Sequence, residues 1–116
     1  MPAPLALAFA GFLLAGVPGS GTTEPPGSAE SFLLDAGRAL GAAASCDQIA
    51  DERIDRDANR LGAAIDRIAK DAPERRAAHR SLSRGVIEGG SAVERGTTDC
   101  AEAEQSLAAI ERRLPR

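Results

Sequence analysis

Aromatic residues are scarce in this chain of 116 residues, which has no tryptophan, no tyrosine and only three phenylalanines. Two of these, Phe9 and Phe12, lie near the N-terminus, so that the rest of the chain keeps only Phe32. A chain of this length has room for one domain. Because its side chains are small and rich in alanine, that domain cannot bury a large core. We therefore expect it to need a covalent staple, a binding partner, or both.

Groups that could carry chemistry are also few. His79 is the only histidine, and the serines have no histidine-based constellation and no G-x-S-x-G motif to activate them. Residues 85–96 are rich in glycine but lack the preceding strand and the lysine of a phosphate-binding loop. A slender helical protein would also offer no enclosed pocket. We therefore expect no enzymatic activity, no cofactor and no metal site, and we rank small-ligand carriage low.

An excess of charge of either sign is lacking as well. The net charge is −3, and acidic and basic residues alternate along the chain. A nucleic-acid-binding surface normally requires a clustered positive charge. We therefore expect no nucleic-acid partner.

The longest apolar run, residues 5–17, lies close to the N-terminus and carries no charged side chain. Its length fits the core of a signal peptide and is short of the roughly 20 residues of a membrane span. Small residues at Gly19 and Gly21 offer cleavage positions, although no lysine or arginine precedes the run. We predict a signal peptide at residues 1–21, cleaved to give a periplasmic or secreted protein. An uncleaved membrane anchor and a buried N-terminal helix are the alternatives.

The first half of the mature chain has the spacing of helices. Residues 22–27 are rich in proline and glycine and are interpreted as a flexible spacer before a helical domain at residues 28–116. A capping-box pattern at residues 45–48 leaves open whether a second helix begins there. Apolar residues then recur every three or four positions over residues 54–68, which predicts a helix that ends near Ala72, before a proline.

The second half carries a longer stripe, from Leu82 to Leu114, in alternating steps of four and three. This spacing is typical of a coiled-coil seam. Several glycines interrupt it, and each costs up to about 1 kcal/mol in a helix interior. A second capping-box pattern at residues 99–102 allows a break near Gly96. Between the two arrangements, we favour one long kinked helix over two short ones.

The positions of the two cysteines link these halves. Cys46 and Cys100 each lie 27 residues from Pro73. If the chain folds back at Pro73, residues whose numbers sum to about 146 face each other, and the two thiols meet. The same register sets Gly89 opposite Ala58, as one of several layers in which small residues oppose small ones. We therefore predict an all-α fold: a long antiparallel helical hairpin, which kinks can divide into three or four helices, with one interhelical disulfide.

A disulfide that closes a loop of roughly 55 residues contributes up to about 4 kcal/mol in the chain-entropy description. Redox-active pairs usually lie close together in sequence, as in C-x-x-C. Cys46 and Cys100 are far apart on the helical stripes, so we favour a structural disulfide. Metal binding by these two thiols and His79 is disfavoured, because the hairpin sets His79 near the turn.

Two charged surfaces are expected on the helices. Asp47, Asp51 and Asp55 follow one side of the first long helix with arginines between them. A straight helix does not converge the oxygens that a hard cation needs, so we interpret this side as solvated and crossed by local ion pairs. The expected pairs include Glu52–Arg56 and Asp66–Lys70.

A basic ridge follows the turn, and it is the candidate partner-binding surface. It consists of Arg75, Arg76, Arg80 and Arg84. Such a ridge could contact an acidic partner or, weakly, an anionic membrane surface. His79 lies among these arginines and is either structural or a pH-responsive group.

The residues therefore predict a small exported non-enzymatic helical protein that acts as an interaction module. A two-helix hairpin would leave outer apolar positions such as Leu34 and Ile87 uncovered, which favours a homodimer or an unknown protein partner. The alternative is a periplasmic stress chaperone that opens under acid or reducing conditions.

Overall fold

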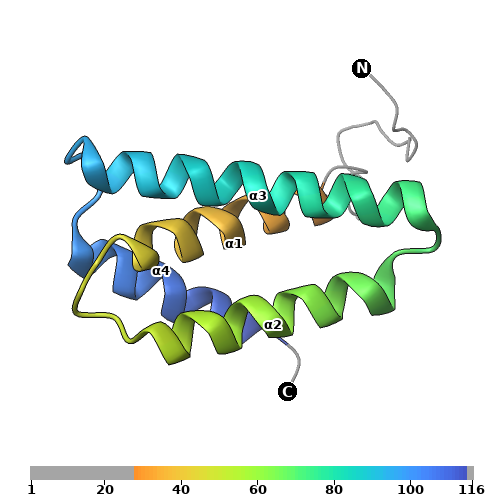
Figure 1. Ribbon diagram of the computed structural model, residues 1–116, viewed down its shortest axis with the longest axis horizontal. Helices are drawn as coiled ribbons and strands as arrows, with labels where there is room; N and C mark the ends of the chain where they lie inside the picture. Colours follow the sequence, from red (N-terminus) through yellow and green to blue (C-terminus); the bar gives the residue numbers. More distant parts are fainter. Residues whose placement is uncertain (1–27, 115–116) are drawn as a thin grey trace, which may run out of the picture. The chain divides into compact units, whose positions relative to one another are not determined.

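The computed structural model describes residues 28–114, which form four α-helices and no strand (Figure 1). The helices are α1 (Ser28–Ala44), α2 (Asp51–Ile68), α3 (Ala72–Glu94) and α4 (Cys100–Arg113). The all-α class is thus confirmed. The predicted signal peptide and spacer, residues 1–21 and 22–27, lie outside the described residues. The chain divides into two units after Phe32, and every contact given below lies within residues 33–114.

The turn between α2 and α3 is set by local chemistry. α2 ends at Ile68, a few residues before the predicted end at Ala72. Asp71 then caps α3: its Oδ1 accepts a hydrogen bond of 2.9 Å from the backbone N–H of Glu74. Pro73 occupies the first turn of α3, where its missing N–H is no loss. The proline that suggested the fold-back point therefore begins a helix.

The long second arm is divided in two, so the single kinked helix that we favoured is wrong. α3 ends where Gly96 adopts φ +80°, a conformation that side chains with a Cβ rarely take. The N–H groups of Gly96 and Thr97 bond to the carbonyls of Val93 and Ala92, which satisfies the end of the helix. Asp99 and Glu102 then form the predicted capping box and start α4.

The first arm is also divided, but not at the predicted cap. Ser45 follows the last residue of α1, and its hydroxyl donates to the carbonyl of Gly41. It therefore belongs to the end of α1, and the capping box expected at residues 45–48 does not form. α2 begins at Asp51 after Ala50, which provides no side-chain cap.

The core is small and aliphatic, as the composition implies. Its largest fully buried apolar side chains are Leu61 of α2 and Leu107 of α4. Alanines of α1 also belong to the core, and Ala36 and Ala43 are completely buried. The α4 stripe is buried as predicted; its members are Ala103, Leu107, Ile110 and, just after the helix, Leu114.

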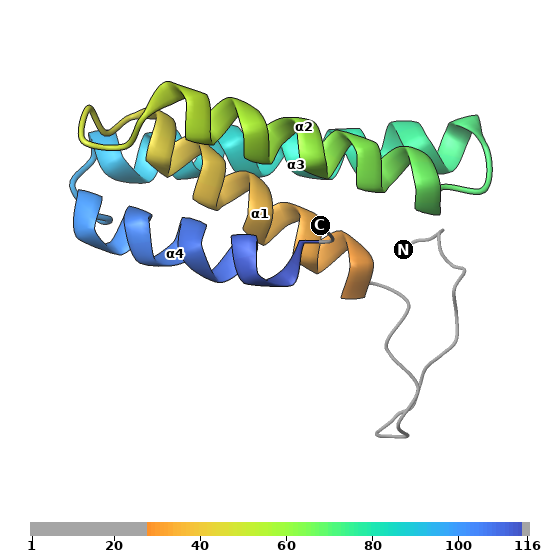
Figure 2. The same ribbon diagram turned by 90° about the horizontal axis from the view of Figure 1, so that it is seen from below.

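Glycines bring the backbones of α1 and α3 into close contact. A Cβ added at Gly37 would lie 3.0 Å from the Cα of Gly85, and one added at Gly85 would lie 3.0 Å from the Cα of Gly37. One turn further on, Gly41 faces the backbone of Val86, and Gly89 faces that of Arg38. Residue numbers rise together along this contact, so α1 and α3 run in the same direction. Figure 2 shows α1 running obliquely to the other helices.

This contact corrects the predicted register. Gly89 packs against Arg38 and Ala42 of α1 rather than against Ala58 of α2. Small residues do bring two helix backbones together, as expected. The helix that meets α3 at these residues is α1 and not α2. Gly96 makes no close approach, because a Cβ there would meet nothing within 4 Å.

Candidate functional site

The two cysteines form a disulfide, as predicted, with their Cα atoms 5.8 Å apart. Cys46 is buried in the segment between α1 and α2, and Cys100 is the first residue of α4. The bond thus ties an interhelical connection to the start of a helix rather than one helix to another. The pair is 54 residues apart in sequence.

The structure places three of the four arginines of the basic ridge side by side. Arg76, Arg80 and Arg84 are exposed and line one shallow depression on the outer side of α3, together with His79 and Ile87. Arg75 is turned away from them toward α2, where its Nε lies 3.4 Å from Oδ1 of Asp66. The predicted Asp66–Lys70 pair is therefore replaced by a contact between helices.

Arg76, Arg80 and Arg84 share a second property. Within residues 28–114, none of the three makes an ion pair with an acidic side chain. Glu88, on the next turn of α3, is bound by Arg38 of α1 at 2.9 Å. These three guanidinium groups are therefore exposed on successive turns of α3 and form no ion pair with any residue that the structure describes.

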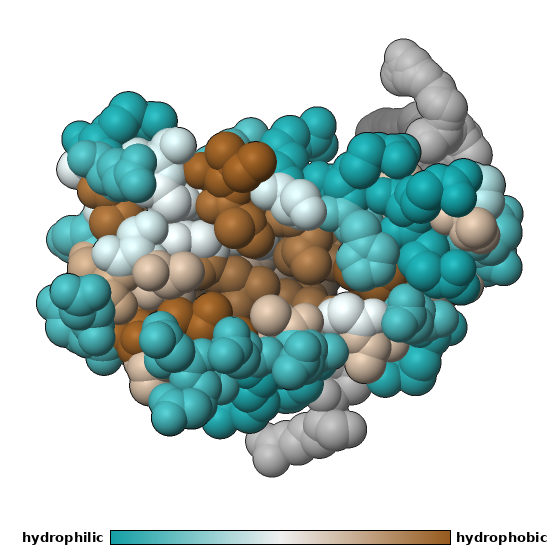
Figure 3. Space-filling view, viewed as in Figure 1, coloured by the Kyte–Doolittle hydropathy of each residue, from teal (hydrophilic) through white to brown (hydrophobic). Residues whose placement is uncertain are grey.

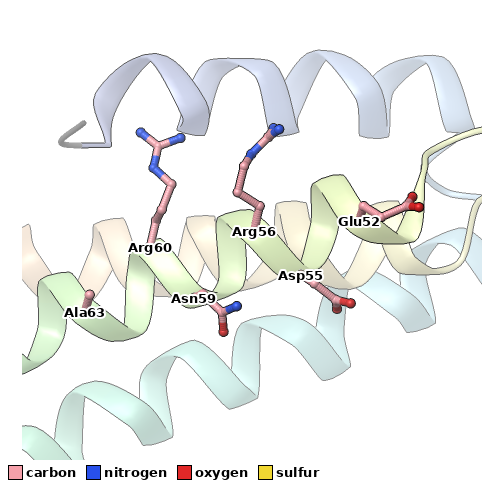
Figure 4. Close-up of a pocket in the computed structure, with 6 residues that line it drawn as sticks. All are labelled: Glu52, Asp55, Arg56, Asn59, Arg60 and Ala63. Carbon is pink, nitrogen blue, oxygen red and sulfur yellow. The ribbon is translucent and has the colours of Figure 1, made fainter.

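The acidic start of α2 is the counterpart of this ridge. Glu52 and Asp55 are exposed and line a shallow depression with Asn59 and two arginines. Figure 4 shows Arg56 and Arg60 extending from α2 toward α4, whereas Asp55 and Asn59 extend from the other side of α2. The expected Glu52–Arg56 pair is absent, because Arg56 pairs with Asp57 and with Glu111 of α4.

Apolar side chains are also exposed on α2 and α3. The stripes predicted to close into a seam are only half-buried here: Ile54 on α2, and Leu82 and Val93 on α3. Val86 is 38% exposed and Ile87 is 70% exposed. Figure 3 shows brown surface running between teal margins over this side of the molecule. We call the surface formed by α2 and α3 around these side chains the open face.

The exposure of Ile87 agrees with the expectation that an outer apolar position stays uncovered. Leu34, the other such position, is half-buried, and its carbonyl oxygen faces Gly85 of α3. α1 therefore finds cover within the chain. The open face keeps exposed apolar side chains, Val86 and Ile87, within residues 33–114.

The structure also contains a buried acidic group that the sequence interpretation missed. Asp57 of α2 is completely buried. Its Oδ1 lies 3.4 Å from Nε of Arg56 and 3.7 Å from Nη1 of Arg60. Its Oδ2 has no hydrogen-bond partner among the described residues. A buried carboxylate oxygen without a donor is costly, and a proton on that oxygen removes the cost.

Glu111 of α4 is the neighbour that explains this arrangement. Arg53 holds Glu111 with two hydrogen bonds of 2.8 Å and also binds Glu104 at 2.7 Å. These bonds from Arg53 are the main cause that lowers the pKa of Glu111 to about 2. Burial, followed by the adjacent Glu111, raises the pKa of Asp57 to about 6. A protonated Asp57 can therefore donate to an ionised Glu111 across the α2–α4 contact.

This cluster had a signal in the sequence. Asp57 precedes Leu61 by four residues and Ala64 by seven, which puts it on the buried stripe of α2. We had grouped the neighbouring arginines with a solvated side. A carboxylate on a buried stripe, with arginine one turn to either side, indicates a polar contact with another helix.

The described residues offer no other obvious chemistry. Within residues 28–114, no three histidine, cysteine or acidic side chains gather as a metal site would require. No helix in that range has the length and apolarity needed to span a bilayer. His79 is exposed beside the arginines of α3. Comparisons with protein-family models, with curated proteins and with solved structures found no match for this chain.

Proposed function

We propose that the protein is an exported, non-enzymatic interaction module that binds a protein partner through the open face. The observation that carries this proposal is the half-exposed seam of α2 and α3. In a chain with so little core, an apolar stripe left in water reduces stability unless a partner covers it. The depressions at its margins are open surface rather than enclosed pockets, which supports binding in preference to catalysis.

The antiparallel hairpin is retained as part of this proposal. α2 and α3 would be its arms, joined by residues 69–71 and linked by the Asp66–Arg75 ion pair. The disulfide supports export, since such bonds persist in oxidising compartments. The apolar N-terminal run supports cleavage of a signal peptide.

A photo-crosslinking residue at Ile87, in protein kept in its native cell envelope, tests the binding face. Arg112 is the matched control position, because it is also exposed but lies on α4. We expect protein adducts from position 87 and not from position 112. No adduct at position 87, or equal adducts at both positions, would contradict the proposal.

Export is tested separately by the intact mass of the protein from that envelope. We expect the first 19 to 21 residues or so to be missing, and a gain of two hydrogens on reduction. A full-length mass with free thiols would contradict the proposal that the protein is exported.

The second candidate, a chaperone opened by stress, is favoured in its reductive form by the single disulfide that holds the helices together. It predicts that reduction increases protection of an aggregating client protein, measured by light scattering. The acid-opened form is disfavoured. Because the pKa of Asp57 is raised by burial, protonation between pH 7 and about pH 5 strengthens the α2–α4 contact.

A further inference from the structure

We propose that the partner of the open face is a second copy of this chain, with the acidic start of α2 on one copy against the arginines of α3 on the other. The inference rests on the proposed function, since it names the occupant of the same face. It differs from a simple apolar dimer because it assigns the pairs of charges that set the orientation.

The charges of the two patches are available for such contacts. Glu52 and Asp55 make no ion pair within residues 28–114, and the same holds for Arg76, Arg80 and Arg84. Most arginines elsewhere are already engaged; Arg53, for example, binds two glutamates of α4. Two unpaired patches of opposite sign on one chain are complementary to the same patches on a second copy.

The positions of the patches satisfy the symmetry of a dimer. The acidic patch lies in the first two turns of α2, next to the connection from α1. The basic patch lies in the first half of α3, next to the turn from α2. The patches are therefore on different helices and toward opposite ends of the α2–α3 pair, and exposed Ile87 lies beside the basic one. A two-fold axis that passes between the patches sets the acidic patch of each copy against the basic patch of the other, so both contacts form at once.

The exposed apolar side chains supply what the charges alone cannot. Exposed ion pairs contribute little free energy, about 0–1 kcal/mol each. Burial of Val86 and Ile87, which are 38% and 70% exposed, removes apolar surface from water and provides the main driving force. The charge pairs then choose the antiparallel, reciprocal orientation and exclude arrangements in which like charges meet.

A charge-swap experiment tests this arrangement in the mature, disulfide-bonded protein. One variant carries Arg76→Glu, Arg80→Glu and Arg84→Glu; the other carries Glu52→Lys and Asp55→Lys. Arg112→Glu on α4 is the control. Sedimentation equilibrium gives the molar mass of each over a micromolar to millimolar range, and far-UV circular dichroism verifies that each is folded.

We expect the wild type and the control to dimerise, and dimerisation of each charge variant to weaken at least tenfold. An equimolar mixture of the two charge variants should recover a dimer, because each acidic patch again meets a basic patch. The wild-type dimer should also weaken as salt concentration rises.

Three outcomes would overturn the inference: a monomeric wild type throughout, dimerisation unaffected by either variant, or a mixture that stays monomeric. If the wild type is monomeric but position 87 still gives adducts with another protein, the proposed function holds. Only the proposal that the partner is a second copy of this chain is then contradicted.

Discussion

Replacing Gly41 by alanine tests the glycine contact that joins α1 to α3. The new Cβ would lie 2.7 Å from the carbonyl carbon of Val86 and 2.8 Å from its Cα. Unbonded carbon atoms prefer about 3.5–4.0 Å, and the obstructing atoms are backbone, which no rotamer change can move aside. The two helices must therefore separate by roughly 1 Å along the contact.

The magnitude follows from two opposing effects. Overpacking of this kind typically costs about 1–3 kcal/mol. Alanine in a helix interior gains about 0.5–1 kcal/mol over glycine. Gly62 of α2 isolates the second effect, because a Cβ there would meet nothing within 4 Å.

After subtraction of the helix-propensity gain, we expect Gly41→Ala to lower the free energy of unfolding by up to about 2.5 kcal/mol, and Gly62→Ala to raise it by about 0.5–1 kcal/mol. The assay is equilibrium urea unfolding followed by far-UV circular dichroism, with the disulfide intact. For a domain of this size, each 1 kcal/mol corresponds to roughly 4–8 °C in Tm. Equal stabilisation by both substitutions would refute the reasoning, since it would mean that the helices do not approach at Gly41.

Three further predictions concern the staple, the buried carboxyl and the end of α3. Reduction, or the Cys46→Ser and Cys100→Ser double variant, should lower the free energy of unfolding by up to about 4 kcal/mol; an unchanged thermal melt after reduction would contradict this. The folded pKa of Asp57, about 6, lies above its ordinary value of 3.8, so the free energy of unfolding should fall as pH rises from about 4 to about 6, by at most about 3 kcal/mol. The pKa of Glu111 is lowered from 4.5 to about 2, so its contribution should be lost as pH falls through that interval, and the two groups together place maximal stability near pH 4. In Asp57→Asn, the free energy of unfolding measured by urea titration should no longer fall between pH 5 and pH 7. A fall of the same size in this variant would show that another group causes it. Gly96→Ala should cost about 1–2 kcal/mol, because φ there is +80°, and a thermal melt equal to that of the wild type would show that the end of α3 relaxes.

The sequence was sufficient for features that depend on local spacing. The capping box at Asp99 and the buried stripe of α4 were read from helical periodicity, and both are present. Such signals survive because capping and amphipathic spacing act within one helix, whatever the packing around it. The bonded pair Cys46–Cys100 is also predicted correctly, although it depends on a fold-back over 54 residues rather than on local spacing.

Features that depend on which helices meet could not be obtained in this way. The predicted register, in which the numbers of facing residues sum to about 146, assumes two unbroken arms. The second arm is not unbroken, because α3 ends before Gly96. The first arm is divided as well, between Ala44 and Asp51, and α1 packs on α3, with Gly37 against Gly85 and Gly41 against Val86. Gly37 and Gly41 have the same four-residue spacing as Gly85 and Gly89. Periodicity alone does not say which glycine-bearing helix faces pack against each other.

The open face was missed for a related reason. Leu82 and Val86 lie on a regular stripe, and a regular stripe was interpreted as a closed seam. Glycine contacts instead turn the buried side of α3 toward α1, where Ser81, Gly85 and Gly89 are covered. The stripe then lies at the edge of that contact and is only partly covered by α2.

Hydrogen-exchange mass spectrometry of the wild-type protein at a low and a high concentration is the most direct test that the open face is the binding surface. With the disulfide intact, we expect protection to increase at the higher concentration in peptides from the first turns of α2 and from α3 around Ile87, and not in peptides from α4. An increase confined to α4, or no increase in a sample whose molar mass has doubled, would contradict the assignment of the open face.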